Sequence, residues 1–197
     1  LVTGVQTCAL PISQMAHFYD LTGGTSSGIS DSKIPDAQSG AEKGYNHALV
    51  GNAGANLIYE SAGMHASLLG FSLEGVVLDN DTIGAAQRTI RGIDISDESM
   101  SLDVIRAAVV DGPGHYLGSA QTLDLMQREY IYPDIYDRLS AKEWVEVGKP
   151  KVLDRAIQHV KDVLATHYPS HIPDALDDII RAELPIRLDR SKMRPSV

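Results

Sequence analysis

Short apolar runs alternate with segments of helical periodicity along the first half of the chain. We predict strands over three of the apolar runs, at residues 17–21, 55–59 and 75–78. A polar loop follows each run, and apolar positions at helical spacing then predict helices over residues 35–50, 64–69 and 82–91. Alternating strand and helix units indicate an α/β fold with a parallel sheet, either open or closed as a barrel.

The helix predicted over residues 35–50 has one apolar stripe and one polar face. The stripe consists of Ala37, Ala41, Tyr45, Ala48 and Leu49. Glu42, Lys43 and Asn46 are expected to face away from it. His47 lies next to the stripe, where a histidine is more often a packed or capping residue than a ligand.

From residue 96 onward the pattern changes to helices and irregular segments. We predict helices over residues 96–110, 119–129, 150–167 and 173–184. The segments around Tyr130–Pro133 and Trp144 look irregular, and Gly112–Gly118 reads as a tight loop. The tail after Arg187 is basic and polar, which predicts a loose segment.

The segment Thr22–Gly40 joins the first predicted strand to the first predicted helix. It contains four glycines and many hydroxyl groups, together with Asp31, Lys33 and Asp36. Such a loop is flexible enough to shape a pocket and polar enough for chemistry. Its turn residues fit an ordinary connection equally well. The Lys-Ser/Thr ending of a phosphate-binding loop is missing, which disfavours that interpretation.

Polar side chains follow each predicted strand. Glu60 follows the second strand, and Asp79, Asn80 and Asp81 follow the third. Because the carboxyl ends of parallel strands meet at one edge, we expect Thr22, Glu60 and Asp79 on the same side of the sheet. The carboxylates of Glu60, Asp79 and Asp81 could bind a divalent metal, but three carboxylates on separate loops are often found in a sequence by chance. We therefore predict no metal site.

His115 is the strongest histidine candidate for a functional site. It lies in a glycine-rich loop that could present it to a pocket. A hydrogen-bonded turn histidine is an equally good interpretation. Tyr59 and Tyr116 either pack in the core or offer an aromatic face to a cation.

Composition and charge narrow the range of partners. A chain of 197 residues with 43% hydrophobic and 22% charged residues is large enough for one domain with a real core. Its net charge of −9 argues against nucleic acid or an anionic membrane as partner. No apolar run approaches the roughly 20 residues needed to cross a bilayer. We expect a cytoplasmic protein.

Residues 1–12 are predicted to be foreign to the folded domain. The run at 2–12 resembles the translation of a sequencing adapter, and it has no basic segment of the kind that opens a signal peptide. The only cysteine, Cys8, lies in this run, so the sequence offers no basis for disulfide or thiol chemistry. We also expect the gene to extend upstream of Ser13.

Six motifs in the chain are long and ordered. They are Ser30-Asp-Ser-Lys-Ile-Pro-Asp, Ala53-Gly-Ala-Asn, Glu60-Ser-Ala-Gly-Met, Leu78-Asp-Asn-Asp, Arg91-Gly-Ile and Gly114-His-Tyr-Leu-Gly. Together they resemble the trimethylamine methyltransferase family, and the likeness extends from about Met15 to about Thr166. Members of this family are larger and form a (β/α)₈ barrel. The resemblance implies the C-terminal part of such a barrel with additional C-terminal helices, over residues 13–190, and a loose tail at 191–197.

The resemblance also implies a reaction and its partners. The family moves a methyl group from a methylated amine to the cobalt of a separate corrinoid protein. The expected partners are therefore a corrinoid protein, which carries the cobalamin, and a small methylated amine, with no cofactor bound directly. Homo-oligomerisation stays open. The enzyme must hold a cation with carboxylates or aromatic faces and aim one methyl group at the barrel mouth.

The site residues implied by the resemblance lie in or beside these motifs. The expected catalytic residues are Glu60, Asp79 and His115. The expected substrate-binding residues are Gly28, Asp31, Lys33, Tyr59 and Asn80.

Gly28 bears on the choice of amine. Trimethylamine-specific members carry pyrrolysine just before a Ser-Asp-x-Lys segment, and alignment to Ser30–Lys33 places that position at Gly28. Glycine has no side chain to form an adduct with a neutral amine, so we expect a quaternary amine such as glycine betaine. Lys33, His115 or backbone amides would bind its carboxylate. The alternatives are trimethylamine as substrate, or a non-catalytic barrel relative that binds a small cationic metabolite.

Overall fold

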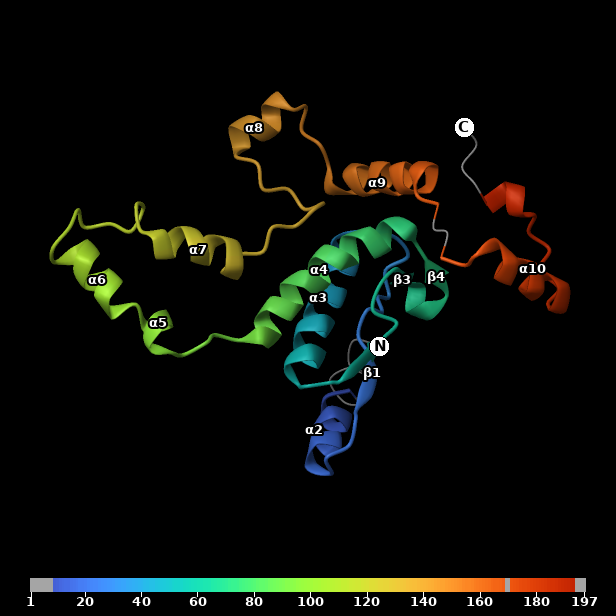
Figure 1. Ribbon diagram of the computed structural model, residues 1–197, viewed down its shortest axis with the longest axis horizontal. Coiled ribbons are helices and arrows are strands. Elements are labelled where there is room, and N and C mark those ends of the chain that lie inside the picture. The colour runs from blue at the N-terminus through green and yellow to red at the C-terminus, as the bar shows by residue number, and fades with distance from the viewer. Residues whose placement is uncertain (1–8, 169–170, 194–197) are drawn as a thin grey trace.

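The computed structural model describes residues 9–168 and 171–193 as a mostly helical α/β protein (Figure 1). Two long helices, α3 (Ala37–Asn52) and α4 (Leu73–Arg91), pack side by side at its centre. A third helix, α9 (Val152–Thr166), packs against α4. Val50 on α3 and Ala156 on α9 are fully buried, so the apolar core lies among these helices.

Two small sheets accompany the helices. Strand β1 (Gly24–Ser26) pairs in parallel with β2 (Leu57–Tyr59). Strand β3 (Met64–His65) pairs antiparallel with β4 (Gly70–Phe71). The α/β class and the strand predicted over residues 55–59 are thereby confirmed. Two parallel strands do not define a barrel, so the (β/α)₈ form stays a prediction.

The first strand lies further along the chain than the apolar pattern indicates. The prediction of a strand at residues 17–21 is wrong, because helix α2 (Leu10–Phe18) occupies its beginning. Pro11 in the first turn of α2 favours a helix there. The imidazole of His17 hydrogen-bonds the Gly54 carbonyl (2.8 Å), which holds the end of α2 against the loop before β2.

The predicted third strand is also wrong, because residues 75–78 lie in α4. Ser72 caps this helix by accepting a hydrogen bond from the Gly75 N–H (2.9 Å), and Glu74 places negative charge in the first turn. These local signals outweigh the strand preference of two consecutive valines. The predicted helix at 82–91 is the second half of the same helix.

Both corrections change where the predicted strand-end residues lie. Thr22 precedes β1, whereas Glu60 follows β2, so in a parallel pair they lie at opposite ends. Asp79 and Asn80 lie within α4 and not at the end of a strand. The predicted placement of Thr22, Glu60 and Asp79 on one side of the sheet is therefore wrong.

The helix predicted over residues 64–69 is replaced by β3, a short turn η2 (Ala66–Leu68) and β4. All three residues of η2 have positive φ angles, from 49° to 75°. A right-handed helix cannot form with this backbone. Two N–H groups of η2 donate to the carbonyls of Ser30 and Ser32, which fastens the turn onto the first long loop.

The predicted helices beyond α4 are confirmed with small shifts. They are α5 (Asp97–Met100), α6 (Leu102–Val109), α7 (Ala120–Glu129), α9 and α10 (Asp174–Glu183). The single helix predicted over 96–110 is divided at Ser101, whose φ is 55°. Figure 1 shows α5, α6 and α7 extending to one side of α4, and α10 lying on the other side.

One further helix replaces a segment predicted to be irregular. Trp144 lies in α8 (Ala141–Glu146), because Ser140 and Glu143 form a reciprocal capping box at its start. At the other end of the chain, the short 3₁₀ turn η3 (Arg190–Met193) begins the predicted loose tail. Residues 194–197 lie outside the described residues.

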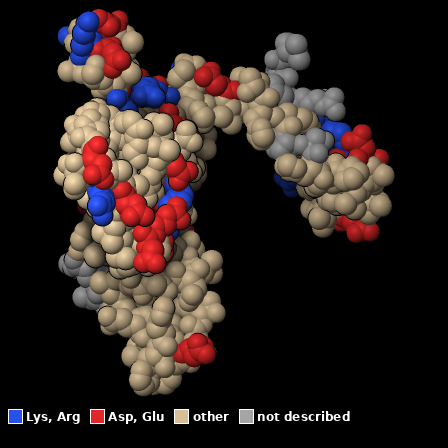
Figure 2. All heavy atoms as spheres, turned by 60° about the vertical axis from the view of Figure 1, so that its left-hand side comes forward, with Lys and Arg blue, Asp and Glu red and all other residues tan. Residues whose placement is uncertain are grey.

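The N-terminal segment exposes a large apolar surface. Figure 2 shows almost no charged side chain over the lower end of the molecule, which carries α2. Phe18 there and Leu57 on β2 are both more than half exposed. Residues 1–8 lie outside the described residues, so the adapter interpretation of residues 1–12 stays a prediction. Within the described residues, no helix combines the length and hydropathy of a membrane span.

Candidate functional site

The chain segments that follow β1 and β2 touch each other at Gly28. The Gly28 N–H donates to the Glu60 carbonyl (3.1 Å). A Cβ atom on Gly28 would lie 2.1 Å from the carbonyl oxygen of Ser61, which is far inside van der Waals contact with rigid backbone. Only glycine fits this approach. The predicted substrate-binding residue Gly28 is thus part of the contact between the two strand ends.

Glu60 has a strained backbone at the end of β2. Its φ is 53°, in the left-handed region that residues with a side chain avoid. Its side chain is exposed, as is that of Tyr59 beside it. Strained positions of this kind are concentrated at functional sites. The structure therefore brings the predicted residues Gly28, Tyr59 and Glu60 together.

The buried face of α3 is polar, contrary to the prediction. Lys43, Asn46 and His47 are buried, while Ala37 and Tyr45 of the apolar stripe are exposed. The prediction that Lys43 and Asn46 face away from the core is wrong. The reason lies in the neighbours, because this face meets polar side chains of α4 and of the loop after β1, with which specific hydrogen bonds form.

A buried ion pair joins α3 to α4. Lys43 Nζ lies 2.6 Å from Asp79 Oδ2, and the two side chains are 1% and 7% exposed. The same Asp79 oxygen accepts the Gly63 N–H at 2.7 Å. Removing a single partner from such a pair is costly, because it leaves one charge buried alone. Asp79 thus links both central helices and the loop after β2.

Two buried histidines flank this ion pair. His47 Nδ1 lies 2.6 Å from Ser27 Oγ, and His65 Nδ1 lies 3.5 Å from Ser39 Oγ. Burial is the main cause that lowers the pKa of both imidazoles below the usual 6.5; the Lys43 ammonium acts in the same direction and the Asp79 carboxylate opposes it. Both rings are therefore neutral at pH 7. The Nε2 atom of each ring is buried without a hydrogen-bond partner among the described residues.

A small pocket lies beside the buried ion pair. It has a volume of about 260 Å³ and lies between the start of α3, the first turns of α4, and α9. Its polar lining includes Asp36, Ser39, Asp79 and Tyr136. Hydrogen bonds from the Ser39 N–H and the Ser32 hydroxyl hold the pKa of the Asp36 carboxyl below its usual value. The pocket is slightly smaller than typical sites for drug-sized ligands.

Asp31 and Lys33 are engaged with the loop itself. The Asp31 carboxylate accepts the Ser67 hydroxyl, and Lys33 Nζ donates to the Asp31 carbonyl at 2.8 Å. Glu42 accepts the Ser30 hydroxyl (2.7 Å) and the Asp31 N–H (2.9 Å). Burial opposes ionisation of Glu42, but these bonds and one from Gln38 outweigh it and lower its pKa. The network fixes the loop to α3.

Two predicted residues are not brought into this region. His115 is exposed on the segment between α6 and α7, which Figure 1 shows away from β1 and β2. Asn80 is exposed on α4. The described residues contain no group of three or more His, Cys, Asp or Glu side chains that could hold a metal ion. The Asp81 carboxylate instead accepts three backbone N–H groups from residues 134–136.

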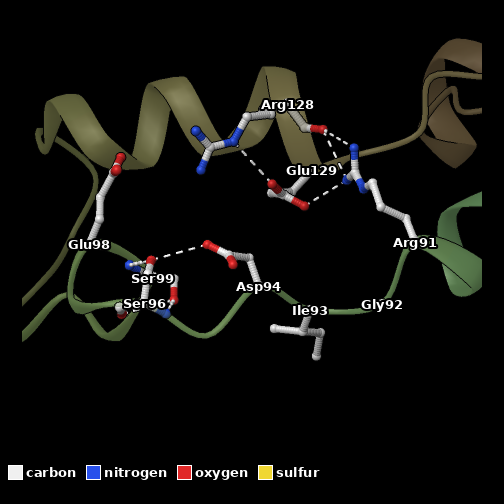
Figure 3. A pocket seen from close by; sticks show the side chains of 9 residues that line it. All are labelled: Arg91, Gly92, Ile93, Asp94, Ser96, Glu98, Ser99, Arg128 and Glu129. Carbon is white, nitrogen blue, oxygen red and sulfur yellow. Dashed lines mark hydrogen bonds and ion pairs between the residues drawn. The ribbon is translucent and has the colours of Figure 1, made fainter.

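A second hollow, drawn in Figure 3, has a volume of about 530 Å³ and lies where the chain leaves α4. Glu129 pairs there with Arg91 (2.7 Å) and with Arg128 (3.1 Å). Arg91 also donates to the carbonyl of Arg128. These side chains are between about one-third and one-half exposed, and each of the two arginines already has Glu129 as its carboxylate partner. We interpret these contacts as ones that join α4 to α7, and we do not interpret the hollow as a ligand-binding site.

Sequence reasoning missed the buried polar groups. Ser39, Lys43, Asn46 and His47 follow one another at spacings of four, three and one residues, and so lie on one side of α3. That polar periodicity is visible in the sequence, but it does not by itself indicate burial. Nothing in the sequence alone distinguishes a buried polar stripe from a solvated one.

Comparison with known proteins identifies the class of this chain. Residues 4–189 match the family described as Trimethylamine methyltransferase (MTTB). The chain belongs to the trimethylamine methyltransferase family.

The relatives include enzymes named for trimethylamine and one named for glycine betaine. The chain is 34% identical to trimethylamine methyltransferase MttB of Methanosarcina thermophila, over 85% of this chain and 34% of the relative. It is 30% identical to the glycine betaine methyltransferase of Desulfitobacterium hafniense (strain Y51), over 93% of this chain and 38% of that relative. The chain thus spans about a third of the length of the curated relatives it matches.

Proposed function

We propose that the complete protein containing this chain transfers a methyl group from a quaternary amine, such as glycine betaine, to the cobalt of a separate corrinoid protein. Membership in the family and the methyltransferase names of the relatives support the reaction class. The corrinoid belongs to the partner protein, and none is bound directly by this chain. The proposal includes a (β/α)₈ barrel, of which β1 and β2 are neighbouring strands.

The observation that carries the choice of substrate is the close approach at Gly28. A side chain at this position would enter the backbone of Ser61 and Glu60. Glycine is therefore required by the local packing, and the position offers no group to activate a neutral amine. A substrate that needs no such group is one whose nitrogen already carries a permanent positive charge.

The chemistry of a quaternary amine suits the side chains at the end of β2. In the transfer, the C–N bond breaks and its electron pair stays on nitrogen, so a neutral tertiary amine leaves without needing a proton. The reduced cobalt supplies both electrons of the new bond. The exposed carboxylate of Glu60 and the ring of Tyr59 would hold the cation in the ground state. Lys33 or backbone amides would bind a substrate carboxylate.

Trimethylamine remains the second candidate substrate, because several relatives are named for it. The complete gene product should be incubated with its corrinoid protein in the reduced state and a panel of methylated amines. We expect the absorbance change of cobalt methylation with glycine betaine or another quaternary amine. Binding of a cationic ligand with no methylation from any amine would instead identify a non-catalytic relative and contradict the proposal.

A further inference from the structure

The loop after β2 is held at both of its ends. At its start, the Glu60 carbonyl accepts the Gly28 N–H at 3.1 Å. At its end, the Gly63 N–H donates to Asp79 Oδ2 at 2.7 Å, and the Gly63 carbonyl accepts the Ser72 N–H at 3.0 Å. The loop is therefore fixed between the segment after β1 and the start of α4.

The Gly63 end of the loop has little freedom to move. Gly63 has a φ of 76°, and a Cβ atom there would lie 2.6 Å from both Phe71 and Val76. The residue is buried, so its N–H needs a protein acceptor. Asp79 is that acceptor, and its orientation is set by Lys43, which is completely buried and donates to the same oxygen.

A buried ion pair is weak evidence for stability, because desolvation offsets its attraction. The presence of the ion pair at this place needs another explanation. Here the pair holds Asp79 Oδ2 where it accepts the Gly63 N–H, at the end of the loop that begins with Glu60. Glu60 itself has a φ of 53°, so its backbone must be held by contacts from outside.

We infer that Lys43 and Asp79 are positioning residues, which hold the loop Glu60–Gly63 and thereby set the place of the Glu60 carboxylate at the end of β2. This inference rests on the proposed function, in which that carboxylate faces the substrate cation. Lys43 does not touch the substrate; it acts through Asp79, and Asp79 acts through the Gly63 N–H. Errors of about 1 Å in such placement can lower a rate by about 100-fold.

Two double variants of the complete protein separate positioning from stability. Lys43→Met with Asp79→Asn removes both charges but keeps an amide oxygen for the Gly63 N–H. Lys43→Met with Asp79→Leu removes the charges and the acceptor. We expect the Asn form to keep kcat within a few-fold of the parent, and the Leu form to lose about 10- to 100-fold in kcat. Val50→Ala, at a fully buried position of the same helix, serves as the control for lost stability alone.

Amide hydrogen exchange of the segment 60–64 supplies a readout that does not depend on activity. We expect fast exchange in the Leu form, and slow exchange in the Asn form and in Val50→Ala. Equal exchange and equal kcat in the two double variants would overturn the inference, and so would a Leu form that fails to fold while the Asn form folds. If the parent methylates no corrinoid protein, the proposed function fails, but the exchange comparison still decides whether the pair holds the loop.

Discussion

Ser27 Oγ and His47 Nδ1 lie 2.6 Å apart, and both side chains are buried between the end of β1 and the inner face of α3. The bond joins Ser27, the residue before Gly28, to the buried polar side of α3, which also carries Lys43. It therefore connects the close contact of the strand ends to the buried ion pair. The His47 ring also has a lowered pKa, chiefly because burial disfavours its charged form.

The stability of the protein should fall as the pH drops below 6.5. His47 and His65 have pKa values below 6.5 when folded and recover the ordinary value when unfolded. The unfolded state then binds more protons, so the free energy of unfolding decreases as the pH falls through 6.5. Well above that pH both states are neutral and the contribution is constant. Urea unfolding at a series of pH values measures this slope.

Histidine variants test the source of that slope. His47→Gln combined with His65→Gln should flatten the dependence between pH 7 and pH 5, whereas His159→Gln, at an exposed position of α9, should leave it unchanged. A slope that persists undiminished in the double variant would assign the effect to other groups.

Glu60→Gly should separate stability from activity. Glycine adopts the φ of 53° without strain, so the free energy of unfolding should stay level or rise by about 1 kcal/mol. Activity should fall, because the carboxylate proposed to hold the cation is lost. Lys149→Gly is the matched control, since Lys149 is exposed and has a φ of 57°. It should show the same stability change with full activity; an active Glu60→Gly form would exclude the role of this carboxylate.

Asp81→Ala should detach the segment at residues 134–136 from α4. Three backbone N–H groups lose their acceptor, and each one left buried costs about 1–3 kcal/mol. We expect a large loss of thermal stability and rapid proteolysis near Ile135. Asp124→Ala removes only an exposed pair with Arg128 and should change stability by less than about 1 kcal/mol. Similar effects of the two substitutions would contradict the anchoring role of Asp81.

Gly28→Ala should disturb the contact between the strand ends. The added Cβ would lie 2.1 Å from the Ser61 carbonyl oxygen, so the backbone must shift. We expect at least a 10-fold loss of kcat/KM, from misplacement of the loop after β2. Gly40→Ala is the control, because a Cβ there meets open space on α3. Full activity of Gly28→Ala would show that the position tolerates a side chain.

The sequence predicted the positions of helices and strands better than it predicted which of their side chains are buried. The helix at 35–50 and the strand at 55–59 follow from periodicity, and both are found within a few residues. The valine-rich run at 75–78 misleads because its strand preference is weak, whereas the Ser72 cap fixes a helix. Such caps were visible in the sequence and could have decided the question.

Of the site residues named from the sequence, the structure brings together three that lie at the ends of β1 and β2 or just beyond them. Gly28, Tyr59 and Glu60, which were named from the family resemblance, lie near one another, although the predicted end of the first strand was wrong. The Lys43–Asp79 pair was out of reach, because a helical pattern does not reveal that a lysine lies inside a protein. Its burial depends on a partner 36 residues away, which tertiary packing alone brings into contact.

The most direct test of the proposed function is the fate of glycine betaine itself. The complete protein, its reduced corrinoid protein and glycine betaine should be mixed, and the amine products followed by proton NMR together with the absorbance of methylated cobalt. Our account predicts dimethylglycine and methylated cobalt in equal amounts, with trimethylamine unreacted when it is supplied instead. Formation of dimethylamine from trimethylamine, with glycine betaine untouched, would contradict it.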